Sequence, residues 1–182
     1  MTTSTYWYIA RGSGIVATVL LTLTVLLGVM STGRAASRHW PRFLTQGLHR
    51  NASLIALGLI AVHIVGVVED PYAKVSPLDT VIPFHAGYRP LWVGLGTLAA
   101  DAMAILVLTS VARRWLPYHG WRVIHSSAYA AWALAVAHGF ATGTDARLTG
   151  VVLLDATCLG LVVLAGSWRV FARMRTEPGV TS

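Results

Sequence analysis

Five long apolar runs are the feature of this 182-residue sequence that most restricts its fold. A helix needs about 20 mainly apolar residues to cross a bilayer, and all five runs reach that length. The runs are Tyr8 to Met30, Phe43 to Val68, Leu91 to Val111, His119 to Ala141 and Gly150 to Phe171. The expected fold is therefore all-α, a membrane bundle of five transmembrane helices that forms a single domain over residues 1–182.

The composition leaves little room for a second domain. Only 12% of the residues are charged and 55% are hydrophobic, whereas soluble domains carry about 25% charged residues. An independent nucleotide-binding or flavin-binding domain needs about 100 residues or more, so we expect none here. The single cysteine, Cys158, excludes a disulfide framework and a thiolate metal cluster.

The basic residues predict the orientation of the bundle. Ten of the fourteen flank the connections and the tail that follow the first, third and fifth runs: Arg34, Arg38, Arg42, Arg50, Arg113, Arg114, Arg122, Arg169, Arg173 and Arg175. The other four are Arg11, Lys74, Arg89 and Arg147, which are mixed with acidic residues. The positive-inside rule places the N-terminus outside and the C-terminus in the cytoplasm. This topology explains the net charge of +7 without nucleic acid as a partner.

Four histidines lie in or at the end of the second and fourth runs, where ionisable side chains are costly. His49 and His63 are 14 positions apart, which is about 21 Å of rise and about 40° short of four full turns. His125 and His138 are 13 positions apart, with about 20 Å of rise but about 140° between them on an ideal helix. Since these two helices are expected to run parallel, His49 matches His125 in depth, and His63 matches His138.

Two imidazoles that approach one iron from opposite faces form the axial ligation of haem, so two levels predict two stacked haems. A single buried histidine is more often explained by an interhelical hydrogen bond, but four at matched depths favour haem. The small residues between His125 and His138, and Gly58 on the second helix, fit a flat macrocycle and close helix packing equally. A His-lined proton or metal-ion transporter without haem is the alternative function.

The segments GLHRNASLIALGLIAVHIVG and WRVIHSSAYAAWALAVAHG resemble the ferric reductase-like transmembrane domain family. That family includes the membrane part of NADPH oxidases and ferric reductases, and the haem subunit of a bacterial methionine sulfoxide reductase system. The resemblance covers about Trp7 to Met174. It implies two b-type haems, an inner one between His49 and His125 and an outer one between His63 and His138, which pass electrons from the cytoplasm outward.

The resemblance also implies an oxidoreductase subunit that crosses the membrane several times. The Arg-rich, Ala-rich composition is compatible with a bacterial plasma membrane. We expect this chain to lack the flavin and nicotinamide domain of the larger relatives, so the expected electron donor is a separate flavin reductase or membrane quinol. Ferric iron, oxygen, a flavoprotein and a methionine sulfoxide reductase partner all remain open as the outer acceptor. The oligomeric state is also open.

Several other polar residues have two interpretations each. Arg50 and Arg122 lie at the depth of the inner haem propionates, although snorkelling to the interface explains them equally well. Asp101 and Asp155 would serve a proton relay, a quinone site or a hydrogen bond between helices. The connection Glu69 to Pro90 is expected outside, over the mouth of the bundle. Arg11, Tyr88 and Arg89 are further candidates for the outer haem, and His85 is either a spare ligand or solvated surface.

Overall fold

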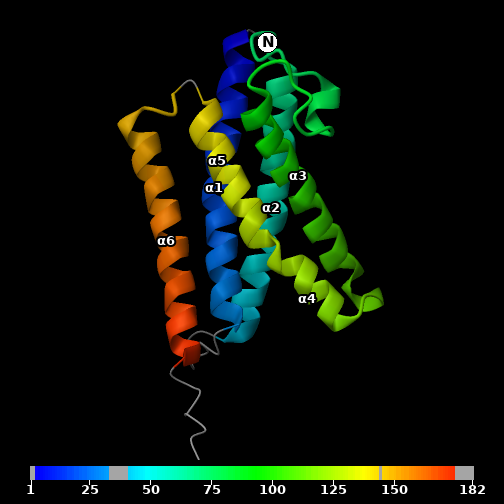
Figure 1. The fold of residues 1–182 in the computed structure, drawn as a ribbon, viewed down its shortest axis with the longest axis vertical. Helices are drawn as coiled ribbons and strands as arrows, with labels where there is room; N and C mark the ends of the chain where they lie inside the picture. Colours follow the sequence, from blue (N-terminus) through cyan, green and yellow to red (C-terminus); the bar gives the residue numbers. More distant parts are fainter. Residues whose placement is uncertain (1–2, 33–40, 144, 175–182) are drawn as a thin grey trace, which may run out of the picture.

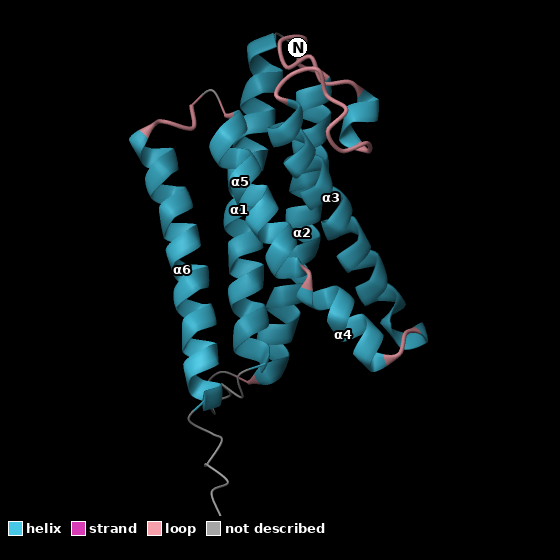
Figure 2. Cartoon of the chain, viewed as in Figure 1, coloured by secondary structure: helices cyan, strands magenta, loops and turns pink. Residues whose placement is uncertain are grey.

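The computed structural model describes residues 3–32, 41–143 and 145–174, and every regular element within them is helical (Figure 1 and Figure 2). The helices are α1 (Thr3–Thr32), α2 (Arg42–Val68), α3 (Pro90–Val111), α4 (Tyr118–Ser126), α5 (Ala128–Thr142) and α6 (Thr149–Met174). Two short 3-10 helices, η1 (Pro77–Thr80) and η2 (Ala112–Trp115), lie in the connections. The predicted all-α class is confirmed.

Four stretches of helix are long and apolar enough to cross a membrane: α1, α2, α3 with η2, and α6. They agree with four of the predicted runs, with ends that differ by only a few residues. The fourth predicted run, His119 to Ala141, is not one continuous helix. It is divided at Ser127 into α4, with nine residues, and α5, with fifteen, and neither part reaches the length of a full span.

Two serines explain the division of the fourth run. The hydroxyl of Ser126 donates to the carbonyl of Val123, and the hydroxyl of Ser127 donates to that of Ile124, each at 2.7 Å. Serine hydroxyls that bond back to helix carbonyls compete with the backbone and bend helices. Helix α4 consequently leaves the bundle at an angle, while α5 continues within it (Figure 1). The angle calculated for one ideal helix between His125 and His138 therefore does not apply.

Helix α1 lies at the centre of the bundle. It packs against α2, α5 and α6, while α3 packs against α5. A buried cluster joins α1, α2, α3 and α5 and consists of Leu21, Val25, Ala56, Met103, Leu106, Ala131 and Trp132. The indole N–H of Trp132 donates to the hydroxyl of Thr22 at 3.0 Å, so this large ring is fixed at mid-depth.

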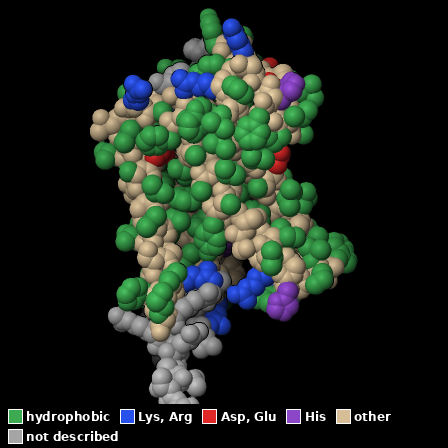
Figure 3. All heavy atoms as spheres, in the orientation of Figure 1, with side chains coloured by type: hydrophobic (Ala, Val, Ile, Leu, Met, Phe, Trp, Pro, Cys, Tyr) green, Lys and Arg blue, Asp and Glu red, His purple; other side chains and the backbone are tan. Residues whose placement is uncertain are grey.

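The surface agrees with a membrane location. Large apolar side chains are exposed along the helices, among them Leu54, Ile105, Leu153 and Leu164. In the space-filling view, apolar atoms cover the middle of the visible face and Lys and Arg side chains gather at its two ends (Figure 3). This is the surface pattern of a membrane-embedded bundle. Arg34, Arg38 and Arg175, which contributed to the predicted orientation, lie outside the described residues.

Candidate functional site

The structure brings the four histidines together in two pairs. His49 on α2 meets His125 on α4, with ring centres 6.0 Å apart and ring planes at 64°. His63 on α2 meets His138 on α5, at 6.2 Å and 86°. These are the two pairs that the sequence predicts. We call them the inner pair and the outer pair, after their predicted sides of the membrane.

Three of the four rings are held in the same way, by a backbone carbonyl that accepts a hydrogen bond from Nδ1. The bonds run from His63 to Ala10 (2.7 Å), from His49 to Thr24 (2.9 Å) and from His138 to Trp92 (2.8 Å). A carbonyl can only accept, so Nδ1 carries the proton in each of these rings. The other ring nitrogen, Nε2, is thereby left unprotonated, with a lone pair that can accept a hydrogen bond or bind a metal.

A glycine follows each of these carbonyl residues by four positions. Residues i and i+4 lie on one face of a helix, so the missing side chain leaves room for the ring beside the carbonyl. A Cβ atom would lie 2.9 Å from Nδ1 of His63 at Gly14, 2.5 Å from Nδ1 of His138 at Gly96 and 3.5 Å from Cε1 of His49 at Gly28. We call each combination of a carbonyl and the glycine four residues later a cradle.

The two cradles on α1 have the same spacing as the histidines of α2. Ala10 and Thr24 are 14 positions apart, as are His49 and His63. Since α1 and α2 pack side by side in opposite directions (Figure 1), each histidine meets its own cradle. The sequence analysis missed the cradles because it considered only the helices that carry histidine. Of the small residues it did consider, Gly58 has no atom within 4 Å of a Cβ placed on it.

His125 has no cradle. On α3, the positions that lie 14 residues after Trp92 and Gly96 are Leu106 and Ser110. Nδ1 of His125 lies 3.4 Å from the hydroxyl oxygen of Ser110, a longer contact than those of the other three rings. The hydroxyl of Thr109 lies 2.7 Å from the carbonyl oxygen of Ile105 and 3.1 Å from that of Leu106.

An aromatic stack also holds the ring of His125. Trp121, one turn earlier on α4, lies parallel to it, with ring centres 4.8 Å apart and planes at 19°. The guanidinium of Arg113 lies 4.3 Å from the centre of the Trp121 ring, within the range of a cation–π contact. The indole N–H of Trp121 is buried and has no hydrogen-bond partner among the described residues.

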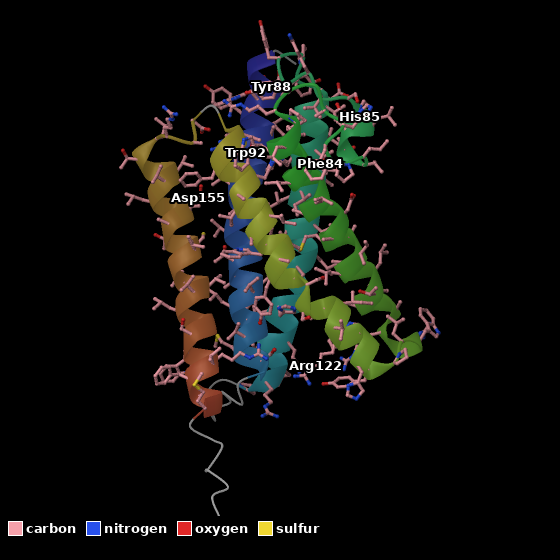
Figure 4. All side chains as sticks on the ribbon, in the orientation of Figure 1. Phe84, His85, Tyr88, Trp92, Arg122 and Asp155 are labelled. Atoms are coloured by element: carbon pink, nitrogen blue, oxygen red, sulfur yellow. The ribbon has the colours of Figure 1, made fainter. Side chains whose placement is uncertain are left out.

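A cavity of about 320 Å³ adjoins the outer pair. Its walls include both outer histidines, Gly14 and Gly96, together with Asp70, Tyr72, Asp79 and Tyr88 from the connection between α2 and α3. Phe84, His85 and Tyr88 all lie at this end of the bundle, whereas Arg122 lies near the opposite end (Figure 4). The prediction that this connection covers one mouth of the bundle is confirmed.

Charged groups surround the same cavity. Arg11 on α1 forms an ion pair with Asp145, with 2.5 Å between Nε and Oδ1, and its Nη2 atom is buried without a hydrogen bond to a described residue. Asp155 on α6 is 8% exposed and lines the cavity. Arg89 donates a hydrogen bond to the carbonyl of Ala141. Asp101 is half-buried on α3 and is not among the residues that line the cavity.

The connection over the cavity is held together around Asp79. Nδ1 of His85 donates to its carboxylate at 2.6 Å, and the backbone N–H of Ser76 donates to the other oxygen at 2.7 Å. The hydroxyl of Thr97 on α3 donates to the carbonyl of Asp79 at 2.8 Å. The hydrogen bond from His85, followed by that from Ser76, lowers the pKa of the Asp79 carboxyl below its ordinary value. His85 therefore has a structural partner.

The remaining candidates, Arg50 and Arg122, are exposed in the structure. Arg50 directly follows His49 on α2, and Arg122 lies on α4 three residues before His125. Both guanidiniums therefore belong to the end of the bundle that holds the inner pair. Neither contributes to the outer cavity.

The separation of the ring centres in each pair is close to the one that two imidazoles would have on opposite sides of one metal ion. With metal–nitrogen bonds of about 2.0 Å and ring centres about 1.15 Å from the nitrogen, two such rings have centres about 6.3 Å apart. The observed separations are 6.0 and 6.2 Å. Among the described residues, no three His, Cys, Asp or Glu side chains gather as they would around a bare metal ion.

Comparisons with known proteins bear on the same residues. A family model described as "Ferric reductase like transmembrane component" matches residues 13–136. The matched range contains His49, His63 and His125 and ends two residues before His138. Comparisons with curated proteins and with solved structures found no match.

Proposed function

This chain belongs to the ferric reductase like transmembrane component family, and we propose that it is a dihaem b-type membrane cytochrome. In this function it carries electrons across the membrane, as an oxidoreductase subunit, from a separate donor to an acceptor on the outer side. The proposal rests on one observation: the four histidines form two pairs, and the rings of each pair have the separation that axial ligation of one iron requires.

The four histidines have equivalent roles in this proposal. His49 and His125 hold the inner haem, and His63 and His138 hold the outer haem, each through Nε2. Each bound haem supplies an iron that accepts and releases one electron. The chain contributes orientation, because carbonyls fix three of the four rings, and it contributes low polarity, because apolar helices exclude water. Trp132, which lies between His125 and His138 in the sequence, belongs to the buried apolar cluster of the bundle.

Arginines are the proposed partners of the haem carboxylates. Guanidinium groups bind carboxylates with two parallel hydrogen bonds. Arg50 and Arg122 are assigned to the inner haem because they accompany the inner pair in sequence and are free to turn toward it. Arg11 is assigned to the outer haem, since it lines the outer cavity and its buried Nη2 atom has no hydrogen bond to a described residue.

The basic side of the chain is the proposed cytoplasmic side, with the N-terminus outside and the α4/α5 pair as a fifth, broken crossing. The single domain over residues 1–182 would lie in a plasma membrane of bacterial type. A flavin reductase that docks on the arginine-rich side, or membrane quinol, supplies the electrons. Lipid surrounds the bundle, and the outer acceptor takes the electrons from the His63–His138 level.

Liposomes test the transmembrane step directly. Purified protein is reconstituted into vesicles that contain ferricyanide, and dithionite is added outside. We expect the enclosed ferricyanide to be consumed, and we expect no consumption above that of empty vesicles with His125→Ala. Protein that holds two haems but leaves the enclosed ferricyanide unchanged would contradict transmembrane electron transfer. The alternative function, a His-lined proton or metal-ion transporter, predicts no haem at all.

A further inference from the structure

The four rings follow one rule with a single exception. Each of three histidines bonds to the carbonyl of residue i and lies over a glycine at i+4. On α3 the outer cradle, Trp92 with Gly96, has a counterpart 14 residues later in which serine replaces glycine. The side chain of Ser110 occupies the space that a cradle leaves empty, and His125 contacts its hydroxyl at 3.4 Å.

We propose that Ser110 is a positioning residue that makes the inner site electronically different from the outer site. This inference rests on the proposed function, since it concerns the ligand strength of His125. A carbonyl only accepts, whereas a hydroxyl both donates and accepts, so Ser110 does not fix the Nδ1–H form of the ring as the three carbonyls do. Ser110 also contacts the ring in place of the carbonyl of Leu106, which lies four residues earlier, at the position that the carbonyl has in a cradle.

The expected consequence is a higher reduction potential at the inner site than a complete cradle would give. A strong acceptor at the outer ring nitrogen raises the basicity of a histidine ligand, and a more basic ligand stabilises the ferric state. The contact of His125 with Ser110 is longer, at 3.4 Å, than the 2.7 to 2.9 Å contacts of the other rings. His125 is thus the least basic of the four proposed iron ligands. Its ring plane is fixed by the stack on Trp121 rather than by a hydrogen bond.

Two opposite substitutions test this inference. Ser110→Gly restores the cradle, so His125 can approach the carbonyl of Leu106. The matched variant, Gly28→Ser, places a hydroxyl beside the other inner ligand, where a Cβ is tolerated at 3.5 Å from His49. A third variant, Ser110→Ala, removes the hydroxyl but keeps the Cβ that blocks the ring.

Redox potentiometry and low-temperature electron paramagnetic resonance of the two ferric low-spin signals are the readouts. We expect Ser110→Gly to shift the inner potential to more negative values and Gly28→Ser to shift it to more positive values. Ser110→Ala should not lower the inner potential, and the outer potential should stay constant in all three variants. The inner resonance should change in Ser110→Gly, because its shape depends on the angle between the ligand planes, now 64°.

The failures of the inference and of the proposed function are distinguishable. If wild-type protein binds two haems and neither Ser110→Gly nor Gly28→Ser moves the inner potential or resonance, the role of Ser110 is wrong. A negative shift in Ser110→Ala equal to that in Ser110→Gly would also overturn it, since the lost hydroxyl alone would then be the cause. Wild-type protein that binds no haem overturns the proposed function itself.

Discussion

The inner pair and the outer pair each consist of two histidines, one of which lies on α2, but the surroundings of the two pairs differ. Both outer rings lie against carbonyls and over glycines, with only 2.9 Å and 2.5 Å available for a Cβ. The inner pair has one looser cradle, at Gly28, and one histidine held by a hydroxyl and a tryptophan. The difference shows that α1 and α3, which carry no histidine, determine how three of the four rings are held, whereas the ring of His125 also depends on Trp121 of its own helix.

The largest expected effect comes from removal of a ligand. His63→Ala or His138→Ala should remove the outer haem, and His49→Ala or His125→Ala the inner one, because a single imidazole does not complete the axial ligation. Each variant should retain one haem per chain by pyridine haemochrome and lose transfer across the vesicle membrane. Retention of both haems in any of the four variants would contradict the ligand assignment at that position.

The glycines provide a graded test of the cradles. Gly96→Ala should destabilise the outer site by about 1–3 kcal/mol, because an added methyl group forces the ring of His138 to move. Gly28→Ala should be neutral or stabilising by up to about 1 kcal/mol, since the contact is ordinary and alanine favours helix. Thermal loss of the haem absorbance measures both effects. Gly58→Ala is the matched control. Equal effects of Gly96→Ala and Gly28→Ala would contradict the claim that the outer cradle is tighter than the inner one.

The aromatic stack should have a smaller effect, confined to the inner site. Trp121→Leu should reduce the retention of the inner haem by about 1 kcal/mol, the typical contribution of an aromatic pair. The control is Trp115→Leu, since Trp115 carries a similar arginine contact from Arg114 at 4.1 Å but is exposed and stacks on none of the histidines that the structure describes. Haem dissociation to an acceptor protein measures both rates. Similar rates for the two variants would show that the stack does not support His125.

The smallest expected effect concerns pH and the connection over the outer cavity. The pKa of Asp79 is lowered in the folded chain, so its hydrogen bonds add stability above the unfolded value of about 3.9, and that stability is lost as pH falls through the folded value. Wild-type protein should therefore unfold at a higher temperature than Asp79→Asn at pH 6, and the difference should shrink toward pH 3. A difference in unfolding temperature that stays constant with pH would contradict the stabilising role assigned to the ionised Asp79 carboxylate.

Much of the fold follows from the sequence because membrane spans are long and nearly uninterrupted. Four helices lie where their apolar runs predict, and the histidine pairs follow from spacing on parallel helices. The division at Ser127 differs from the predicted continuous helix, although the sequence carries a signal for it: residues 119–127 contain two histidines, an arginine and two serines, and they are much more polar than residues 128–142. It decides the geometry of the site, since it lets His125 and His138 both face α2 although one ideal helix would separate them.

The cradles are the part of the site that the sequence analysis could not assign. A backbone carbonyl has no side-chain signature, and glycines in membrane helices usually indicate close helix packing. The available signal was the shared spacing of 14 residues between Gly14 and Gly28 and between His49 and His63. That signal has meaning only when α1 is known to lie against α2. The contact of Ser110 with His125 likewise depends on how α3 lies beside α4.

The haem content of the purified protein tests the central claim most directly. Oxidised and dithionite-reduced visible spectra in detergent, with pyridine haemochrome quantitation, should give two b-type haems per chain with low-spin, bis-imidazole features. One haem per chain would contradict one of the two pairs. Protein expressed with an adequate haem supply that contains no haem would contradict the function proposed for all four histidines and favour the transporter.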